Sequence, residues 1–363
     1  MDKPGFFDLL NGCTKFLGYH YRKTPRQVFQ ELAEFTPETM HDDVYGQGKL
    51  INDFEDEIAK LLGKEAAVFM PSGTMAQQIV LRIWSEKQGS PNIAFHPKCH
   101  LEIHEQKAYQ KLHRLHGILV GSPDRLITLE DLNNVQEPLA ALLLELPQRE
   151  IGGQLPSWED LNAQIEWARS KGIPTHLDGA RLWDCQPYYQ RSYAEIAALF
   201  DTVYVSFYKI LAGISGAVLA GPRDIIAESR IWLRRHGGNL RSLYPYVLSA
   251  QMGMLEHLDQ MSTYHHKAVE IATVLKDVPG IEIVPDPPQT VMMHLYLHGD
   301  KDRLEQAAID IAQETGVFMF YTLTPTLIPN VQKQELTVGN ATLDISGAEI
   351  ASLYRLLLEK ARA

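Results

Sequence analysis

The sequence predicts an α/β protein with a large, mainly parallel sheet domain flanked by helices and a smaller C-terminal α+β domain. Strand-like and helix-like segments alternate through residue 220, a pattern typical of a parallel sheet with helices on both faces. The apolar run at 174–178 lies between two helical patterns, as a buried parallel strand does. The length of 363 residues, with 45% hydrophobic and 22% charged residues, is sufficient for two such domains.

The composition excludes several classes of protein. A net charge of −11 and a pI near 5.7 argue against non-specific nucleic-acid binding. No apolar stretch approaches the roughly 20 residues of a membrane span, and the start MDKPGFFDLLNGC does not resemble a signal peptide. The three scattered cysteines predict neither a disulfide framework nor a zinc site, and they fit a reducing compartment. We therefore expect a cytoplasmic protein without a nucleic-acid or membrane partner.

Three regions are expected along the chain. Residues 1–24 look irregular and form an N-terminal arm rich in aromatic and basic side chains. Residues 25–245 form the large domain, and residues 246–363 form the small one. The pattern predicts a long helix at 244–276 that joins the two domains. The small domain then combines predicted strands and helices, at 281–284, 291–297, 301–314, 317–321, 335–345 and 347–361.

A small polar turn follows the predicted strand at 66–70. Ser72, Gly73 and Thr74 lead into a helix that begins near Met75. The first amides of a helix are unpaired, and glycine lets an anion come close, so this turn could hold a phosphate. An ordinary helix cap by Ser72 or Thr74 explains the same pattern.

Histidines gather after the predicted strand at 92–95. His100 and His104 are four residues apart, which is the spacing of a metal pair, but no third ligand stands at metal spacing. We therefore predict no metal site. His100 differs from the others because it opens a helix, where its ring could stack on an aromatic cofactor.

Two charged residues stand at the ends of successive predicted strands. Asp178 ends the strand at 174–178, and Lys209 follows the next strand-like run. Ligands of parallel sheets bind at the carboxyl ends of the strands, so these residues and the Ser72–Thr74 turn should meet at one edge. Pyridoxal 5'-phosphate needs a lysine amine for a Schiff base and an anionic partner for its pyridine nitrogen. The sequence therefore predicts pyridoxal phosphate as the cofactor.

Several segments resemble the threonine aldolase and β-eliminating lyase family of pyridoxal-phosphate enzymes, which has the aspartate-aminotransferase-like, type I transferase fold. They are HDDVYG (41–46), LLGKEAAVFMPSGTMAQQ (61–78), HLDGARLW (176–183) and the Lys209 region followed by GAVLAG (216–221). The resemblance covers residues 25–245 well and the C-terminal part loosely.

The resemblance implies a role for each matching residue. Lys209 would form the internal aldimine, Asp178 would bind the pyridine nitrogen, and His100 would stack on the ring. Arg181 would reach the ring hydroxyl or the substrate carboxylate. The phosphate would be held by the turn of Ser72, Gly73 and Thr74.

The resemblance also implies an oligomer. Tyr45 and Gly46 belong to a loop that in the family lies near the site of a neighbouring subunit. Arg241, in GGNLRS, matches an arginine that approaches the phosphate from that neighbour. We therefore expect a homodimer or homotetramer with shared active sites.

Four departures from the family pattern fall mostly on the substrate side. Gly18-Tyr19-His20 stands where the family has Ser-Asp-Thr, and Leu146-Pro147-Gln148 follows Glu145 where it has Asn-Thr-His. Tyr208 replaces the serine before the lysine, and residues 335–346 lack the arginine that grips the substrate carboxylate. The cofactor half of the site is intact, whereas the substrate half is altered.

The predicted reaction is retro-aldol cleavage of a β-hydroxy-α-amino acid, of the threonine or allo-threonine type, to glycine and an aldehyde. With Gln148 at the family's histidine position, the base could be His100, His20 or a water. Arg181, alone or with Arg22 or Arg26, would hold the substrate carboxylate. The alternatives are a β-eliminating amino-acid lyase, which would release ammonia and a keto acid, and a non-catalytic pyridoxal-phosphate-binding protein.

Overall fold

The computed structural model describes residues 6–362, with side chains from residue 8 onward. The chain divides into two compact units. The large unit comprises Thr24–Glu150 and Leu155–Asp259, and the small unit comprises Met1–Lys23, Ile151–Gln154 and Gln260–Ala363. Among the described helices, none is long and apolar enough to cross a membrane.

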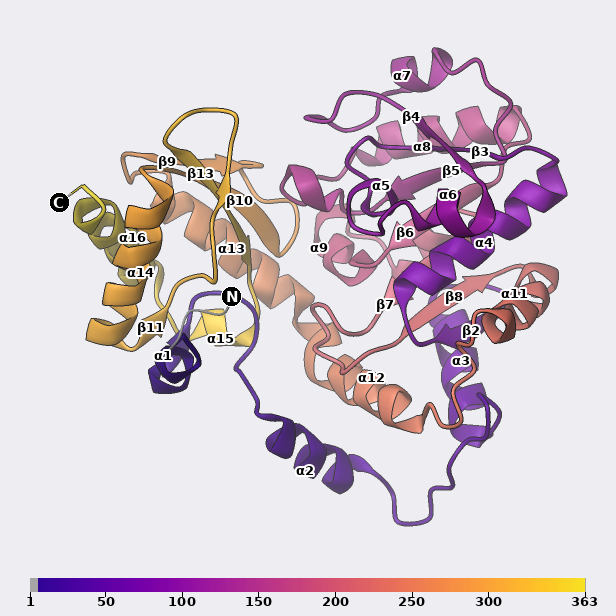
Figure 1. Ribbon diagram of the computed structural model, residues 1–363, viewed down its shortest axis with the longest axis horizontal. Helices are drawn as coiled ribbons and strands as arrows, with labels where there is room; N and C mark the ends of the chain where they lie inside the picture. The colour runs from indigo at the N-terminus through magenta and orange to yellow at the C-terminus, as the bar shows by residue number, and fades with distance from the viewer. Residues whose placement is uncertain (1–5, 363) are drawn as a thin grey trace. The chain divides into compact units, whose positions relative to one another are not determined.

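The large unit is built on a seven-stranded sheet (Figure 1) in the order β2-β8-β7-β6-β5-β3-β4. Strand β8 runs antiparallel to its neighbours β2 and β7, and the other neighbouring pairs are parallel. The predicted mainly parallel sheet is therefore confirmed. The strands are β2 (Ala66–Met70), β3 (Asn92–Phe95), β4 (His116–Leu119), β5 (Ala141–Glu145), β6 (Thr175–Gly179), β7 (Thr202–Ser206) and β8 (Ala217–Gly221).

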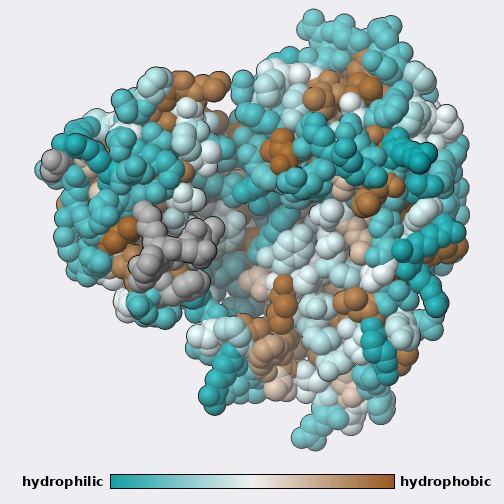
Figure 2. Space-filling view, in the orientation of Figure 1, coloured by the Kyte–Doolittle hydropathy of each residue, from teal (hydrophilic) through white to brown (hydrophobic). Residues whose placement is uncertain are grey.

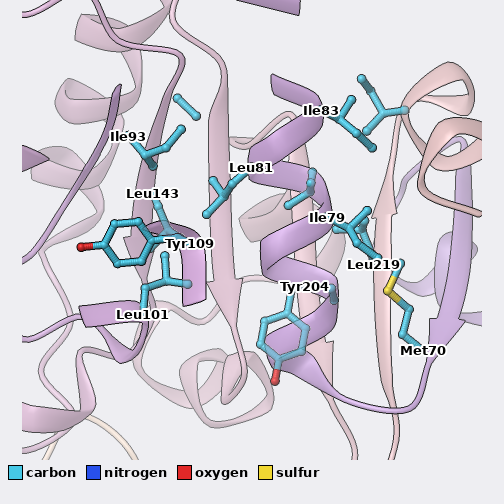
Figure 3. Close-up of a cluster of buried hydrophobic side chains, with 14 of the residues drawn as sticks. Met70, Ile79, Leu81, Ile83, Ile93, Leu101, Tyr109, Leu143, Tyr204 and Leu219 are labelled. Carbon is cyan, nitrogen blue, oxygen red and sulfur yellow. The ribbon is translucent and has the colours of Figure 1, made fainter. Parts of the chain in front are cut away.

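Helices connect and cover these strands. Strands β6, β7 and β8 are buried along their whole length, as expected of strands covered on both faces. Figure 3 shows part of the core around helix α4, where Ile79 lies beside Leu219 and Leu81 points to the opposite side of the helix. The helices of this unit are α2 (Pro25–Phe35), α3 (Lys49–Leu61), α4 (Gly73–Gln88), α5 (His100–Ile103), α6 (Ala108–His113), α7 (Leu129–Asn133), α8 (Trp158–Ser170), α9 (Gln186–Tyr189), α10 (Tyr193–Ala197), α11 (Arg223–Arg235) and α12 (Tyr244–His257).

The small unit has the predicted α+β composition. Its four-stranded antiparallel sheet has the order β12-β13-β10-β9. The strands are β9 (Ile281–Val284), β10 (Met292–His298), β12 (Thr324–Pro325) and β13 (Val331–Thr337). The helices are α1 (Phe6–Gly12), α13 (Met261–Leu275), α14 (Lys301–Thr315), α15 (Asn340–Leu343) and α16 (Gly347–Lys360).

The expectation of an irregular backbone at 1–24 is wrong for most of its described part. Residues 6–12 form α1, and β1 (Lys15–Phe16) pairs in parallel with β11 (Val317–Phe318). Leu10 and Cys13 are buried in a cluster with Phe318. A partner strand some 300 residues away along the chain decides this pairing, so no local pattern announces it; residues 1–5 lie outside the described part.

Two further predictions about the C-terminal half need correction. The helix predicted at 244–276 is broken into α12 and α13 by a 3₁₀ turn, Leu258–Gln260. The strand predicted at 335–345 ends at Thr337, and residues 340–343 form α15 instead. The amide of Gly339 donates to Thr342 Oγ1 at 3.2 Å, which starts the helix where the alternating pattern would have continued the strand.

Candidate active site

Three parallel strands bring the predicted charged residues to one edge of the sheet. In the register of β5, β6 and β7, Glu145 lies opposite Asp178, and Asp178 lies opposite Tyr204. Lys209 follows β7 by three residues. The carboxyl ends of β5, β6 and β7 therefore gather these groups, as the sequence predicted for Asp178 and Lys209.

The Asp178 carboxylate is buried and fixed by two donors. Its side chain is 1% exposed; Oδ1 accepts from the Ala180 amide at 3.1 Å, and Oδ2 accepts from Gln77 Nε2 at 2.9 Å. Gln77 is itself 1% exposed and comes from the second turn of α4. This glutamine was missed by the sequence analysis, because its partner lies 101 residues away.

Lys209 is held in an environment that favours its neutral form. Burial and the Arg181 guanidinium together lower the pKa of its amine to about 8, although the charges of Asp178 and Glu145 oppose the shift. Arg181 lies two residues after the end of β6 and is 9% exposed. An amine with such a pKa is available as a nucleophile near neutral pH.

His100 opens α5 and is part of a chain of three side chains. Its Nδ1 lies 2.9 Å from Glu105 Oε1, and Glu105 Oε2 accepts from Gln78 Nε2 at 2.6 Å. Burial lowers the pKa of His100, but the Glu105 hydrogen bond and the charges of Asp178 and Glu105 outweigh it, so the pKa is raised. Glu105 lies in the turn between α5 and α6, where no helical spacing points to it.

Glu145 organises the backbone around this histidine. Its Oε2 accepts from the His100 amide at 3.3 Å and from Gln148 Nε2 at 3.1 Å, while Oε1 accepts from the Arg149 amide at 3.3 Å. Gln148 Nε2 also donates to the Lys98 carbonyl at 3.2 Å. Burial and the charge of Asp178 raise the pKa of Glu145 to about 7.

Asp184 is a further buried carboxyl group that the sequence analysis did not single out. It is fully buried in the turn after Arg181, and neither of its carboxylate oxygens has a hydrogen-bond partner among the described residues. Burial raises its pKa to about 7, although Arg181 and Lys209 oppose the shift. This acid is therefore largely neutral below that pH.

The predicted anion turn starts helix α4. Ser72 Oγ accepts from the Met75 amide at 3.3 Å, so Ser72 is the helix cap. The structure shows why position 73 must be glycine, which the sequence did not reveal. A Cβ atom at this position would lie 1.8 Å from the Tyr204 hydroxyl. The glycine is therefore required by a phenol packed against the turn, in addition to any anion that the turn binds.

Changing Gly73 to alanine is expected to destabilise the protein by ~1–3 kcal/mol, the usual cost of overpacking a tight site. The added methyl group would overlap both Oη and Cζ of Tyr204. Denaturant unfolding measures the loss. Gly12→Ala is the control, because a Cβ there meets nothing within 4 Å. If adding Tyr204→Ala to Gly73→Ala recovers none of the lost stability, the overlap is not the cause.

The remaining predicted residues lie elsewhere. Arg241 is 59% exposed, donates to the Asp43 carbonyl at 3.2 Å and lies 3.8 Å from Asp42. The described contacts of the Arg241 side chain are therefore with the loop that contains Asp42 and Asp43, and not with Lys209. His20 belongs to the small unit, where its Nδ1 accepts from the Asn340 amide at 3.2 Å. Arg22 is also in the small unit, and Arg26 is exposed on α2.

Comparison with known protein families decides the identity of this arrangement. The family model described as Beta-eliminating lyase matches residues 33–298. This chain belongs to the threonine aldolase and β-eliminating lyase family. Its members are lyases that depend on pyridoxal phosphate, and pyridoxal phosphate is the cofactor of this chain.

Relatives with assigned activities cover most of the chain. The low-specificity L-threonine aldolase 1 of Arabidopsis thaliana is 25% identical over 77% of this chain and 80% of its own length. The aldolase vrtJ of Penicillium aethiopicum is 31% identical over 68% of this chain and 66% of its own length. The family match therefore extends through the whole of the candidate site.

Solved structures of other proteins share the fold of this chain. A Listeria monocytogenes protein provisionally named an L-allo-threonine aldolase has a TM-score of 0.93 and 41% identity, covering 97% of this chain and 98% of its own. A serine palmitoyltransferase of Sphingomonas wittichii is only 14% identical, with a TM-score of 0.70 over 96% of this chain and 87% of its own, and shares the fold alone. The predicted type I fold of pyridoxal-phosphate enzymes is confirmed.

The site of this lyase suits its cofactor on structural grounds. A buried amine of lowered pKa and a fixed carboxylate converge at one sheet edge, and the start of a long helix lies in the same unit. A Schiff-base amine, an anionic partner for a ring nitrogen and amides for a phosphate are what pyridoxal phosphate requires.

Proposed function

We propose that this lyase cleaves the Cα–Cβ bond of a β-hydroxy-α-amino acid of the threonine or allo-threonine type, releasing glycine and an aldehyde. The observation that carries the proposal is that the Lys209 amine, with its lowered pKa, and the fixed Asp178 carboxylate lie at the same edge of the sheet. The names of the Listeria and Arabidopsis relatives support this class of substrate.

In this proposal each residue of the large unit has a defined task. Lys209 binds the cofactor covalently, and Asp178 keeps the cofactor's ring nitrogen protonated. Held by these residues, pyridoxal phosphate would supply an electron sink for the bond that breaks at Cα. Ser72, Gly73 and Thr74 face the phosphate from the start of α4, where free amides favour an anion.

His100 is the base that we assign to the β-hydroxyl proton. With Nδ1 bonded to Glu105, its Nε2 remains the ring nitrogen that can take up a proton, and the raised pKa makes it a stronger base. Gln148, at the family's histidine position, has an amide that cannot accept a proton, and its Nε2 already donates twice. Gln148 therefore orients groups without titrating.

Changing Glu105 to glutamine is expected to move the acid limb of the pH–rate profile to lower pH. A base must be neutral to act, so the rate rises as pH passes the pKa of His100. Without the Glu105 carboxylate, which raises the pKa of His100, burial lowers this pKa, and the acid limb moves to lower pH with it. We also expect kcat on the plateau to fall about tenfold, because the imidazole is a weaker base and is less firmly oriented.

The pH dependence of kcat/KM with threonine measures this shift. Glu102→Gln is the control, because Glu102 bonds Tyr109 and Lys107 outside the His100 contact. An unmoved acid limb in Glu105→Gln would remove His100 from the role of base.

Arg181 is the group that we assign to the substrate carboxylate. It is 9% exposed and follows Asp178 by three residues, and its charge is among the causes that lower the pKa of Lys209. A guanidinium binds a carboxylate with two parallel hydrogen bonds, which fixes the amino acid in one orientation.

Aldehyde release from L-threonine and L-allo-threonine by the cofactor-loaded protein tests the proposed function. Acetaldehyde together with glycine supports it. Ammonia and a keto acid without acetaldehyde would instead identify a β-eliminating lyase. A visible cofactor band with no turnover on a broad panel of amino acids would identify a cofactor-binding protein without catalysis.

We also propose that the protein is a cytoplasmic homodimer or homotetramer with shared active sites. Figure 2 shows hydrophobic residues exposed in patches among hydrophilic ones, and Phe29 on helix α2 is 65% exposed. In the same unit Tyr45 is 57% exposed and lines a cavity of about 490 Å³ with Arg230 and Arg234. Exposed aromatic side chains such as Phe29 and Tyr45 suit contact with a second copy. Light scattering would give the mass, and a monomer would contradict the proposal.

A further inference from the structure

We propose that Tyr208 and Tyr204 complete the phosphate site of the cofactor, with Tyr208 donating its hydroxyl hydrogen to the phosphate and Tyr204 holding Tyr208 in place. The inference rests on the proposed cofactor site. It concerns this chain in particular, because Tyr208 stands where the family pattern has a serine.

Tyr204 carries a buried hydroxyl to the start of helix α4. It lies on β7 opposite Asp178 and is 2% exposed. Its Oη would be 1.8 Å from a Cβ on Gly73, so the phenol is packed directly against the first residue of the helix. Figure 3 shows the Tyr204 ring beside this end of α4, with its hydroxyl pointing away from Leu81 and Ile79.

Tyr208 places a second hydroxyl group next to that of Tyr204, on a side chain that is partly exposed. Its Oη lies 3.4 Å from Tyr204 Oη, and its side chain is 37% exposed. The Lys209 amine lies 5.6 Å from the centre of the Tyr208 ring. The two phenols therefore lie between Lys209, which in the proposed function binds the cofactor, and the start of α4, which faces its phosphate.

The chemistry of the pair suits a phosphate. Burial raises the pKa of Tyr204 well above its ordinary value, with the nearby Tyr208 and Asp178 adding to the shift, so Tyr204 keeps its proton. Tyr204 can then donate to Tyr208, which leaves the Tyr208 hydrogen for an anion. Helix amides supply the other donors that a phosphate needs. A serine at position 208 would be too short to span from the lysine segment to this helix start.

The experiment compares the cofactor with its analogue that lacks the phosphate. The protein is freed of cofactor and titrated with pyridoxal phosphate and with pyridoxal, following the visible band and protein fluorescence. Tyr208→Phe is expected to weaken pyridoxal phosphate about tenfold, as for the loss of one hydrogen bond to a charged group, and to change pyridoxal less than about twofold. Tyr204→Phe is expected to act in the same direction by a smaller factor.

The control is Tyr109→Phe, which removes a phenol bonded to Glu102 in the same unit. Equal losses for pyridoxal phosphate and pyridoxal in Tyr208→Phe would overturn the inference, because the phenol would then contact only the ring. Unchanged affinity for both would overturn it as well. A wild-type protein that binds neither compound would instead overturn the proposed function, so the two failures are distinguishable.

Discussion

Changing Lys209 to alanine is expected to lower aldehyde release from threonine on the order of 10³-fold or more and to abolish the cofactor's visible band. In the proposed function Lys209 supplies the amine through which the cofactor is bound, and burial lowers the pKa of that amine to about 8. Glycine and acetaldehyde formation and the absorption spectrum measure the two effects in the same sample.

Lys64→Ala is the matched control for this experiment. Lys64 lies in the same unit, burial lowers its pKa to about 8 as it does for Lys209, and its amine donates to the Phe200 carbonyl at 2.5 Å. We expect this variant to keep both the visible band and the turnover, because the described partner of Lys64 is the Phe200 carbonyl, which has no assigned role at the cofactor. Full turnover in Lys209→Ala would show that the reaction does not use this lysine.

Changing Asp178 to asparagine is expected to lower kcat on the order of 10³-fold while leaving the fold intact. The neutral amide cannot keep the cofactor's ring nitrogen protonated. The site can accept the change in hydrogen bonding, because the Gln77 Oε1 has no partner among the described residues and can turn toward the new amide group. The Ala180 amide keeps an oxygen acceptor in either case.

Thermal unfolding and steady-state kinetics together distinguish a loss of kcat caused by the missing charge from a loss caused by a damaged fold in this variant. Asp201→Asn is the matched control, since Asp201 bonds the Thr175 amide at 2.7 Å at the other end of β6. We expect the control to retain its kcat. A similar kcat in Asp178→Asn and the wild type would show that the carboxylate is not the partner of the ring nitrogen.

The paired strands of the large unit were predictable because their signals are local. An apolar run such as 174–178 needs burial on two faces, and the helical patterns beside it supply the cover. Asp178 and Lys209 could be placed at one edge for the same reason, because the direction of parallel strands fixes where their carboxyl ends lie.

The support around those residues could not be predicted. Gln77 reaches Asp178, and Gln78 reaches Glu105, from adjacent positions of one helix that point in different directions. The sequence marks Gly73 as a turn residue but does not show that Tyr204 fills the space beside it. Such contacts depend on how a helix is rotated against a sheet, and side-chain periodicity does not specify this rotation for buried polar groups.

The sequence by itself determined the sheet class and the cofactor, and it led to the prediction that Asp178 and Lys209 bind the two reactive ends of that cofactor, because the apolar period, the turn residues and the motif order are all local properties. Tertiary structure alone decided that β1 pairs with β11, that Glu105 raises the pKa of His100, and that two phenols lie beside the α4 start. These features join residues far apart in the chain, and only the packing of the folded chain brings such residues within hydrogen-bonding distance.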